Sequence, residues 1–145
     1  MKGTETNVVT GENLLDIVSR WGFTTGQVVQ EIGWDEDVDQ DLREAIEEAV
    51  DGDLEDEDFG EIADVVLLWF RDDDGDLTDS LVDAVTALDD GGNLWLLTPK
   101  NGVSGHVSPS VVQEAASTAG LNATSPVVVG ETWSASRIAV RGRGK

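Results

Sequence analysis

The side chains with the clearest capacity for chemistry form an acidic turn in the middle of the chain, Asp72–Asp76, which reads Asp-Asp-Asp-Gly-Asp. Calcium loops use carboxylate oxygens at alternate positions around a glycine turn, so the stretch has the composition of a divalent-cation site. If Gly75 is the sixth position of such a loop, the first and twelfth positions fall on Phe70 and Leu81, which offer no carboxylate. We therefore favour a solvated turn that also caps a helix, and weak cation binding is an alternative.

Two more polar residues, Lys100 and His106, lie in a loop rich in glycine and serine. Histidine changes charge near neutral pH and is the usual general base, but His106 is the single histidine of the chain. The sequence has no cysteine, no Gly-x-Ser-x-Gly elbow and no phosphate-binding P-loop. With no nucleophile to pair with His106, we assign no catalytic residue and no metal site.

Trp34 is followed directly by Asp35, Glu36 and Asp37. A tryptophan in a loop is a frequent anchor of protein interfaces, and the surrounding acids favour a partner rich in arginine or lysine. Trp133 lies in a second predicted loop, and we predict that it is also an interface anchor. The alternative for both rings is that they close the edge of the hydrophobic core.

The acidic charge is confined to one part of the sequence. The net charge is −21, and residues 31–90 contain 25 Asp and Glu against two bases, Arg43 and Arg71. The other 85 residues contain the remaining five acids and seven bases. Such a chain is repelled by nucleic-acid phosphates and anionic lipids, so we predict neither as a partner. High solubility explains the charge equally well, but the asymmetry also indicates an acidic face that meets a basic protein.

Hydrophobic patterning indicates alternating helices and strands. The runs 65–70 and 93–97 are almost entirely apolar, which is typical of central parallel strands covered on both faces. No run approaches the ~18 residues of a membrane span, and the N-terminus lacks the pattern of a signal peptide, so we expect a cytoplasmic protein. The predicted helices are 12–21, 37–50, 77–88 and 109–119, and the predicted strands are 28–32, 65–70, 93–97, 127–129 and 137–140, with a possible short edge strand in 51–61.

This alternation predicts an α/β three-layer sandwich with a Rossmann-like, mostly parallel sheet and a C-terminal antiparallel hairpin. The predicted organisation is a flexible N-terminus (1–10), one α/β domain (11–140) and a basic disordered tail (141–145). Ligands of such sheets bind beyond the carboxyl ends of the strands. Those ends are expected at 33–37, 71–76 and 98–106, so Trp34 and Asp72–Asp76 should share one rim.

Glu31-Ile32-Gly33 ends a predicted strand, and 64–70 and 94–100 are two later strand regions. In this order they resemble the start of the glycine-rich motif and the fourth and fifth strands of class I S-adenosylmethionine-dependent methyltransferases. The resemblance implies a shortened methyltransferase-like fold without the family's second and third strands. Asp35 and Asp37 stand where the motif has further glycines, which let the backbone approach the cofactor. We therefore predict no cofactor.

A closer resemblance is to the actinobacterial domain-of-unknown-function family 3052. It rests on the strings Gln30–Asp37, Asp64–Asp76, Leu96–Lys100, Gly105–Val107 and Ala119–Leu121. This resemblance covers about residues 12–140. It implies an actinobacterial cytoplasmic protein and brings no mechanism.

The sequence favours a non-enzymatic binding or regulatory protein whose acidic face contacts an unidentified protein with a basic surface. The alternatives are a divergent S-adenosylmethionine-dependent methyltransferase and a weak divalent-cation-binding protein; the oligomeric state stays open. The predicted partner-binding residues are Trp34, Asp35, Glu36, Asp37, Asp72, Asp74, Asp76 and Trp133, and the candidates in the strand-end loops are Gly33, Lys100 and His106.

Overall fold

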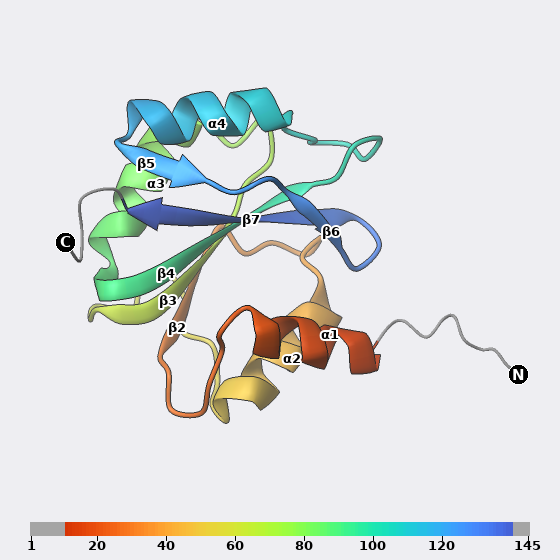
Figure 1. Cartoon of the computed structure of the whole chain (residues 1–145), viewed down its shortest axis with the longest axis vertical. Helices are drawn as coiled ribbons and strands as arrows, with labels where there is room; N and C mark the ends of the chain where they lie inside the picture. The colour runs from red at the N-terminus through yellow and green to blue at the C-terminus, as the bar shows by residue number, and fades with distance from the viewer. Residues whose placement is uncertain (1–10, 141–145) are drawn as a thin grey trace, which may run out of the picture.

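The computed structural model describes residues 11–140, and the predictions for 1–10 and 141–145 lie outside this range. Helices and strands alternate along most of the chain (Figure 1). In order, the elements are α1 (Gly11–Arg20), β2 (Val29–Ile32), α2 (Gln40–Val50), β3 (Ala63–Trp69), α3 (Leu77–Thr86), β4 (Leu88–Pro99), α4 (Pro109–Thr118), β5 (Leu121–Ala123), β6 (Val127–Val129) and β7 (Trp133–Val140).

Within the described residues the strands form one mixed sheet in the order β2-β3-β4-β7-β5, with β6 also paired to β7. β2, β3 and β4 are parallel, and β7 runs antiparallel to β4, from Pro99 opposite Trp133 to Leu94 opposite Ile138. β5 and β6 both pair antiparallel with β7. The predicted mostly parallel sheet with a closing antiparallel hairpin is confirmed.

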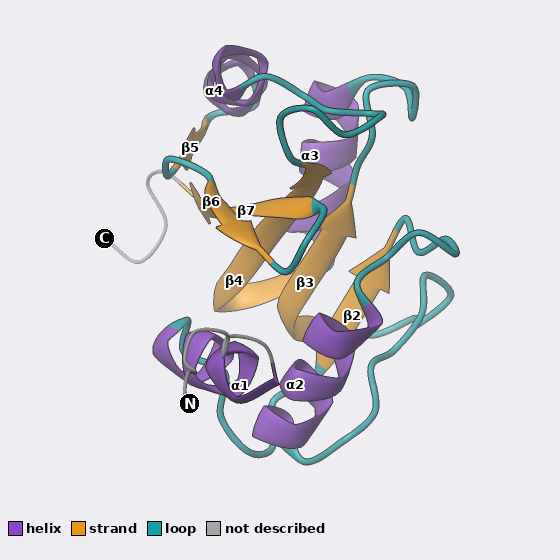
Figure 2. Cartoon of the chain, turned by 90° about the vertical axis from the view of Figure 1, so that its right-hand side faces the viewer, coloured by secondary structure: helices purple, strands orange, loops and turns teal. Residues whose placement is uncertain are grey.

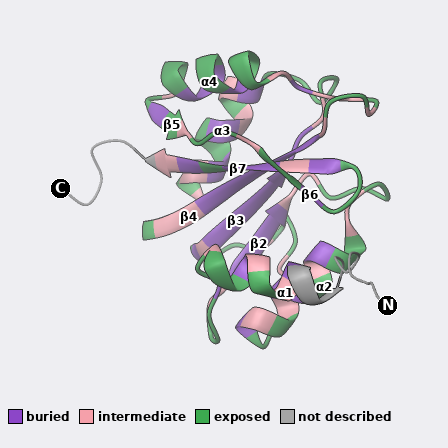
Figure 3. Cartoon of the chain, turned by 45° about the vertical axis from the view of Figure 1, so that its right-hand side comes forward, coloured by how far each residue is buried: buried purple, intermediate pink, exposed green. Residues whose placement is uncertain are grey.

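Helices cover both faces of this sheet, α1 and α2 on one face and α3 and α4 on the other (Figure 2). Successive residues of β3 contribute to opposite cores: Val65 and Leu67 pack toward α1 and α2, and Val66 and Leu68 pack toward α3 and α4. The strands are therefore buried along their central length (Figure 3). This two-sided burial is the reason for the unbroken apolar run 65–70, and it confirms the three-layer architecture.

Polar side chains set where α2 and α4 begin. The predicted start of α4 is confirmed, with Ser108 as its cap and Pro109 in its first turn. α2 begins at Gln40 rather than near Asp37, because the Asp39 carboxylate accepts the backbone N–H of Leu42 at 3.0 Å. The carboxylate of Asp37 therefore lies outside the helix, where it is available for another contact.

Boundaries of α3, β4 and β7 also differ from the expectation. α3 ends at Thr86 rather than at residue 88, β4 begins at Leu88, which pairs with Ala63, rather than at residue 93, and β7 begins at Trp133 rather than at residue 137. A Cβ at Gly92 would lie 2.7 Å from the backbone oxygen of Asp64, so this glycine allows close approach of two strands rather than the end of a helix. β5 was not predicted, because three residues with one buried side chain carry no alternating pattern.

The segment after α2 defines the point at which the strand order reverses. Glu55 forms a single parallel bridge on the outer edge of β2, with hydrogen bonds of 2.8 Å to Val29 and Glu31. The chain thus moves outward from β2 through α2 to Glu55, and then returns across β2 to β3. Because the chain leaves β2 toward one face and β3 toward the other, a crevice opens between their carboxyl ends.

Candidate functional site

The loops that follow β2, β3 and β4 meet around a cavity of about 570 Å³. Asp35, Asp37 and the turn Asp72–Asp74 bring five carboxylates to its wall, as expected from the parallel strands. The remaining lining residues are Arg71, Pro99, Val103, Ser104, Gly105, Thr132 and Trp133.

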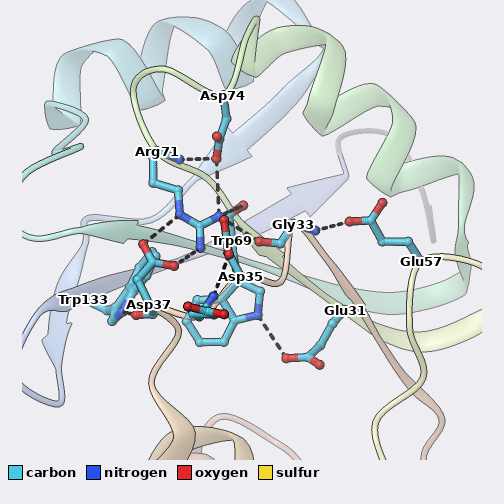
Figure 4. A network of polar contacts seen from close by, with 10 residues as sticks. Glu31, Gly33, Asp35, Asp37, Glu57, Trp69, Arg71, Asp74 and Trp133 are labelled. Carbon is cyan, nitrogen blue, oxygen red and sulfur yellow. Dashed lines mark hydrogen bonds and ion pairs between the residues drawn. The ribbon is translucent and has the colours of Figure 1, made fainter.

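Arg71 occupies the crevice between β2 and β3 (Figure 4). Its side chain is only 11% exposed. One terminal nitrogen, Nη1, donates to the backbone oxygens of Gly33 at 2.7 Å and Trp69 at 3.3 Å. Nε donates to Asp37 at 3.1 Å and Nη2 to the other oxygen of the same carboxylate, while Asp74 accepts from Nη1 at 3.3 Å. One guanidinium therefore joins the ends of both strands and both acidic loops.

Trp133 forms the wall of this site, and its predicted place in an exposed loop is wrong. It begins β7 and is 1% exposed, because the short turn after β6 returns the chain directly into the sheet. Its indole N–H donates to the backbone oxygen of Asp37 at 3.0 Å, and the Arg71 guanidinium carbon lies 5.2 Å from its ring centre. Trp133 is a structural residue and cannot be a surface anchor.

A second ion pair, between Glu31 and Arg43, is linked to the first through Trp69 and Trp133. The carboxylate of Glu31, on β2, accepts from Arg43 at 2.7 and 2.8 Å and from the indole nitrogen of Trp69 at 3.1 Å. The Trp69 ring meets Trp133 edge to face at 4.9 Å. Arg43 and Arg71, the two bases of segment 31–90, are thus both bound to acids of the same segment.

These contacts shift the ionisation of the paired groups. The hydrogen bond from Arg71 lowers the pKa of Asp37, although burial opposes the shift. Burial by itself would lower the pKa of Arg71, but the hydrogen bond and charge of Asp37, followed by those of Asp74, raise it. The pKa of Arg43 is raised in the same way by its hydrogen bond to Glu31. The ion pair at Arg71 therefore persists from neutral pH well into the acidic range.

The carboxylates of the acidic turn have separate contacts. Asp74 accepts the backbone N–H of Arg71 at 2.9 Å, whereas Asp76 caps α3 by accepting from Asp79 at 3.2 Å. Among residues 11–140, no group of three or more histidine, aspartate and glutamate side chains is arranged to hold a metal ion. The alternative of a divalent-cation site at this turn therefore has no supporting geometry.

Lys100 and His106 lie in the loop after β4, as predicted, but neither lines the cavity. The Nδ1 atom of His106 lies 2.9 Å from the backbone oxygen of Pro99. A carbonyl oxygen only accepts, so Nδ1 carries the proton and the ring ties the two ends of the loop together. The backbone N–H of Lys100 donates to Thr132 at 2.9 Å. Both residues position the loop.

Gly33 allows the two strand ends to approach one another. Its φ is +83°, and a Cβ at this position would lie 2.2 Å from the backbone oxygen of Trp69. Its N–H donates to the carboxylate of Glu57 at 2.7 Å. The turn that begins the resemblance to the methyltransferase motif is thus present, and it carries Trp34 to the surface.

Trp34 is 52% exposed, whereas Trp69 and Trp133 are fully buried. Trp21 and Trp95 stack on one another with ring centres 4.0 Å apart. All five tryptophans lie within the described residues; Trp21 is partly buried, and Trp34 is the one exposed ring of the five. The expectation of a loop tryptophan at the acidic rim is met by Trp34.

Comparison with known proteins places the chain in a family. Residues 18–142 match the family described as "Protein of unknown function (DUF3052)", and the chain belongs to it. Uncharacterised proteins of Mycobacterium tuberculosis and Mycobacterium bovis are 52% identical over 131 residues, which cover 90% of this chain and 82% of theirs.

The solved structures that it resembles include several methyltransferases. The riboflavin-derivative dimethyltransferase RosA of Streptomyces davawensis has a TM-score of 0.62 at 13% identity, over 90% of this chain. Human N-acetylserotonin methyltransferase, solved with S-adenosylmethionine, has a TM-score of 0.62 at 12% identity, over 91% of this chain. The chain spans about half the length of these two proteins (54% and 52%), and at this identity the likeness shows a methyltransferase-like Rossmann fold alone. No helix within residues 11–140 is long and apolar enough to cross a membrane.

The residues of the crevice do not fit S-adenosylmethionine. A ligand at the strand reversal would enter between the ends of β2 and β3, where the side chain of Arg71 lies. Asp35, Asp37 and Asp74 face the same space and would repel the carboxylate of the cofactor. On the outer side of β2, Glu55 contributes a single bridge in place of a full strand. We derive no methyl-transfer step for this chain.

We expect no measurable binding of S-adenosylmethionine in calorimetry at millimolar cofactor. S-adenosylhomocysteine, which lacks the sulfonium charge, is the control for nonspecific attraction of a cation to the acidic rim. A dissociation constant below about 100 μM for either compound, which is a binding free energy of roughly −5.5 kcal/mol, would contradict the conclusion that the crevice does not fit the cofactor.

The lowered pKa of Asp37 predicts a specific pH dependence. A carboxylate with a pKa lower in the folded than in the unfolded protein stabilises the fold above the unfolded value, about 3.9, and loses this effect as the pH falls through the folded value. Asp37→Asn should therefore lower the melting temperature between pH 7 and 5, and the gap to the native protein should close toward pH 2. Asp35→Asn, which removes no ion pair with arginine, is the control. A gap that stays constant over this range would contradict the prediction.

Proposed function

We propose that this protein is a non-enzymatic binding module whose acidic face, centred on Trp34, binds a basic segment of a protein partner. The observation that carries the proposal is a half-exposed tryptophan that lines two hollows, each with several carboxylates, in a segment whose two arginines are already paired. An uncompensated acidic surface with one aromatic ring suits cationic side chains, which are attracted by the carboxylates and by the ring face.

Trp34 lines two hollows. The first, of about 300 Å³, lies at the ends of β2 and β3, where Asp35, Asp74 and Glu57 line it together with Arg71, whose charge is already paired. The second, of about 420 Å³, faces the segment after α2 and is lined by Glu31, Arg43, Leu54, Asp56, Glu57 and Asp58 together with Trp34. Glu57 belongs to both, so an extended basic segment that contacts Trp34 would meet carboxylates in each hollow.

The acids at this surface make mainly local contacts. Asp56 accepts from the backbone N–H of Asp58 at 2.9 Å, and Asp35 accepts from that of Glu36 at 2.7 Å. Such bonds leave each carboxylate its full negative charge. The attraction to a basic partner would therefore act mainly on the rate of association and would weaken with ionic strength.

A divergent methyltransferase is the second candidate, and the fold of its structural neighbours is the observation that favours it. The occupied crevice counts against it. Calorimetry with the cofactor separates the two candidates, because only the enzyme requires this ligand.

We expect the protein to bind a fluorescent peptide of alternating arginine and glycine, measured by anisotropy, at low salt. Trp34→Ala should weaken this binding by about 1–3 kcal/mol, the usual range for an aromatic anchor. The double variant Asp56→Asn/Asp58→Asn should also weaken it, since both carboxylates line the second hollow.

The matched control is Asp83→Asn/Glu114→Gln, which removes the same charge from exposed positions on α3 and α4, on the other face of the sheet. Raising the salt from about 0.1 M to about 1 M shortens the screening length from ~10 to ~3 Å and should abolish binding. Equal losses in the control and in the rim variants, with no effect of Trp34→Ala, would show that the acidic rim is only a solvated surface.

A further inference from the structure

The crevice at the strand reversal has the chemistry of a guanidinium site. Two backbone oxygens, of Gly33 and Trp69, face it from the ends of β2 and β3. The carboxylates of Asp37 and Asp74 close it from the two loops, and the ring of Trp133 forms one wall. All of these groups accept hydrogen bonds or attract cations, and none of them donates to the space between them.

The hydrogen bonds in the crevice fit the planar guanidinium group of arginine rather than the single ammonium nitrogen of lysine. Nε and Nη2 of Arg71 bind the two oxygens of Asp37 side by side, and Nη1 points to the backbone oxygens on the opposite side. Arginine presents five N–H groups in one plane, whereas lysine presents three around one nitrogen. A lysine ammonium at this position could not reach Asp37 with two bonds and the strand ends at the same time.

The walls are built closely around the stem of the same side chain. A Cβ at Gly105 would lie 3.2 Å from the Cβ of Arg71 and 3.3 Å from its Cγ. The backbone oxygen of Gly105 also accepts from Asp72 at 2.9 Å, which fixes the loop that carries Arg71. Close packing at Gly105 therefore fixes the stem of Arg71, while its guanidinium group lies between the cavities of about 570 and 300 Å³ that it lines.

We propose that the ligand crevice of this methyltransferase-like sheet is a guanidinium-binding cage, filled from within by Arg71 in the place of an external ligand. The proposal is independent of the partner-binding function. Removal of the guanidinium leaves carboxylates and carbonyl oxygens facing one another, so the fold without it is destabilised. The same vacancy should accept a small guanidinium ion from solution.

Thermal unfolding of the full chain as Arg71→Ala tests this. We expect a melting temperature below that of the native protein, and a rise of a few degrees on addition of about 20 mM methylguanidinium, as for any ligand that binds only the folded state. Methylammonium at the same concentration supplies the charge without the planar fork and should give no such rise. The matched control is Arg137→Ala, an exposed arginine that bonds Asn93, which should respond to neither ion.

Arg71→Lys provides the second measurement if Arg71→Ala does not fold. This variant keeps the charge and loses the fork, so we expect it to unfold at a lower temperature than the native protein. Equal recovery with methylammonium, no recovery in a folded Arg71→Ala, or a native melting temperature for Arg71→Lys would each overturn the proposal. If Arg71→Ala is unfolded in buffer, its refolding in methylguanidinium alone, followed by circular dichroism, supports the cage.

Discussion

The attraction between one buried guanidinium and the acids around it is the interaction on which the functional end of this molecule depends. Segment 31–90 contains 25 acids, and repulsion among them opposes any arrangement that brings the strand-end loops together. Arg71 offsets this repulsion where it is greatest, by binding Asp37 and Asp74 while it also bonds to the ends of β2 and β3. Asp37 and Asp74, which would otherwise repel one another, are thereby held together by Arg71. Among the other acids, Asp35, Asp56, Glu57 and Asp58 line the hollows beside Trp34.

The same arrangement separates the methyltransferase-like sheet of this chain from the loop residues that would have to hold a cofactor. The fold depends on the apolar strands and on two-sided burial, and both are present in the chain. A cofactor site depends on a few loop positions, and here Asp35, Asp37 and Arg71 have the wrong size or charge for the ligand. Sheet architecture and loop chemistry vary separately, so the likeness to methyltransferases shows the fold of this chain alone.

The sequence was sufficient to predict the elements with strong periodicity or with recognisable ends. The apolar runs of β3 and β4, and the Ser-Pro start of α4, imply their positions through burial and capping. β5 and the early start of β4 could not be predicted, because they depend on pairing with strands distant in sequence. Trp133 was misplaced for the same reason: its burial depends on packing against Trp69 and Asp37, nearly a hundred residues away in the second case. Arg71 was missed as the centre of the site, although an isolated base among acids, next to a buried strand, is the signal that could have identified it.

The most direct test of this account is a double-mutant cycle between Arg71 and Asp37, measured as the free energy of unfolding in urea at pH 7. Arg71→Met, Asp37→Asn and the double variant are compared with the native protein, so that the coupling of the two side chains is separated from their individual contributions. The account predicts a favourable coupling of about 1 kcal/mol or more, because the hydrogen bonds join charged groups and one partner is buried. A coupling indistinguishable from zero would show that the two loops are held together by other contacts and would contradict the central role of Arg71.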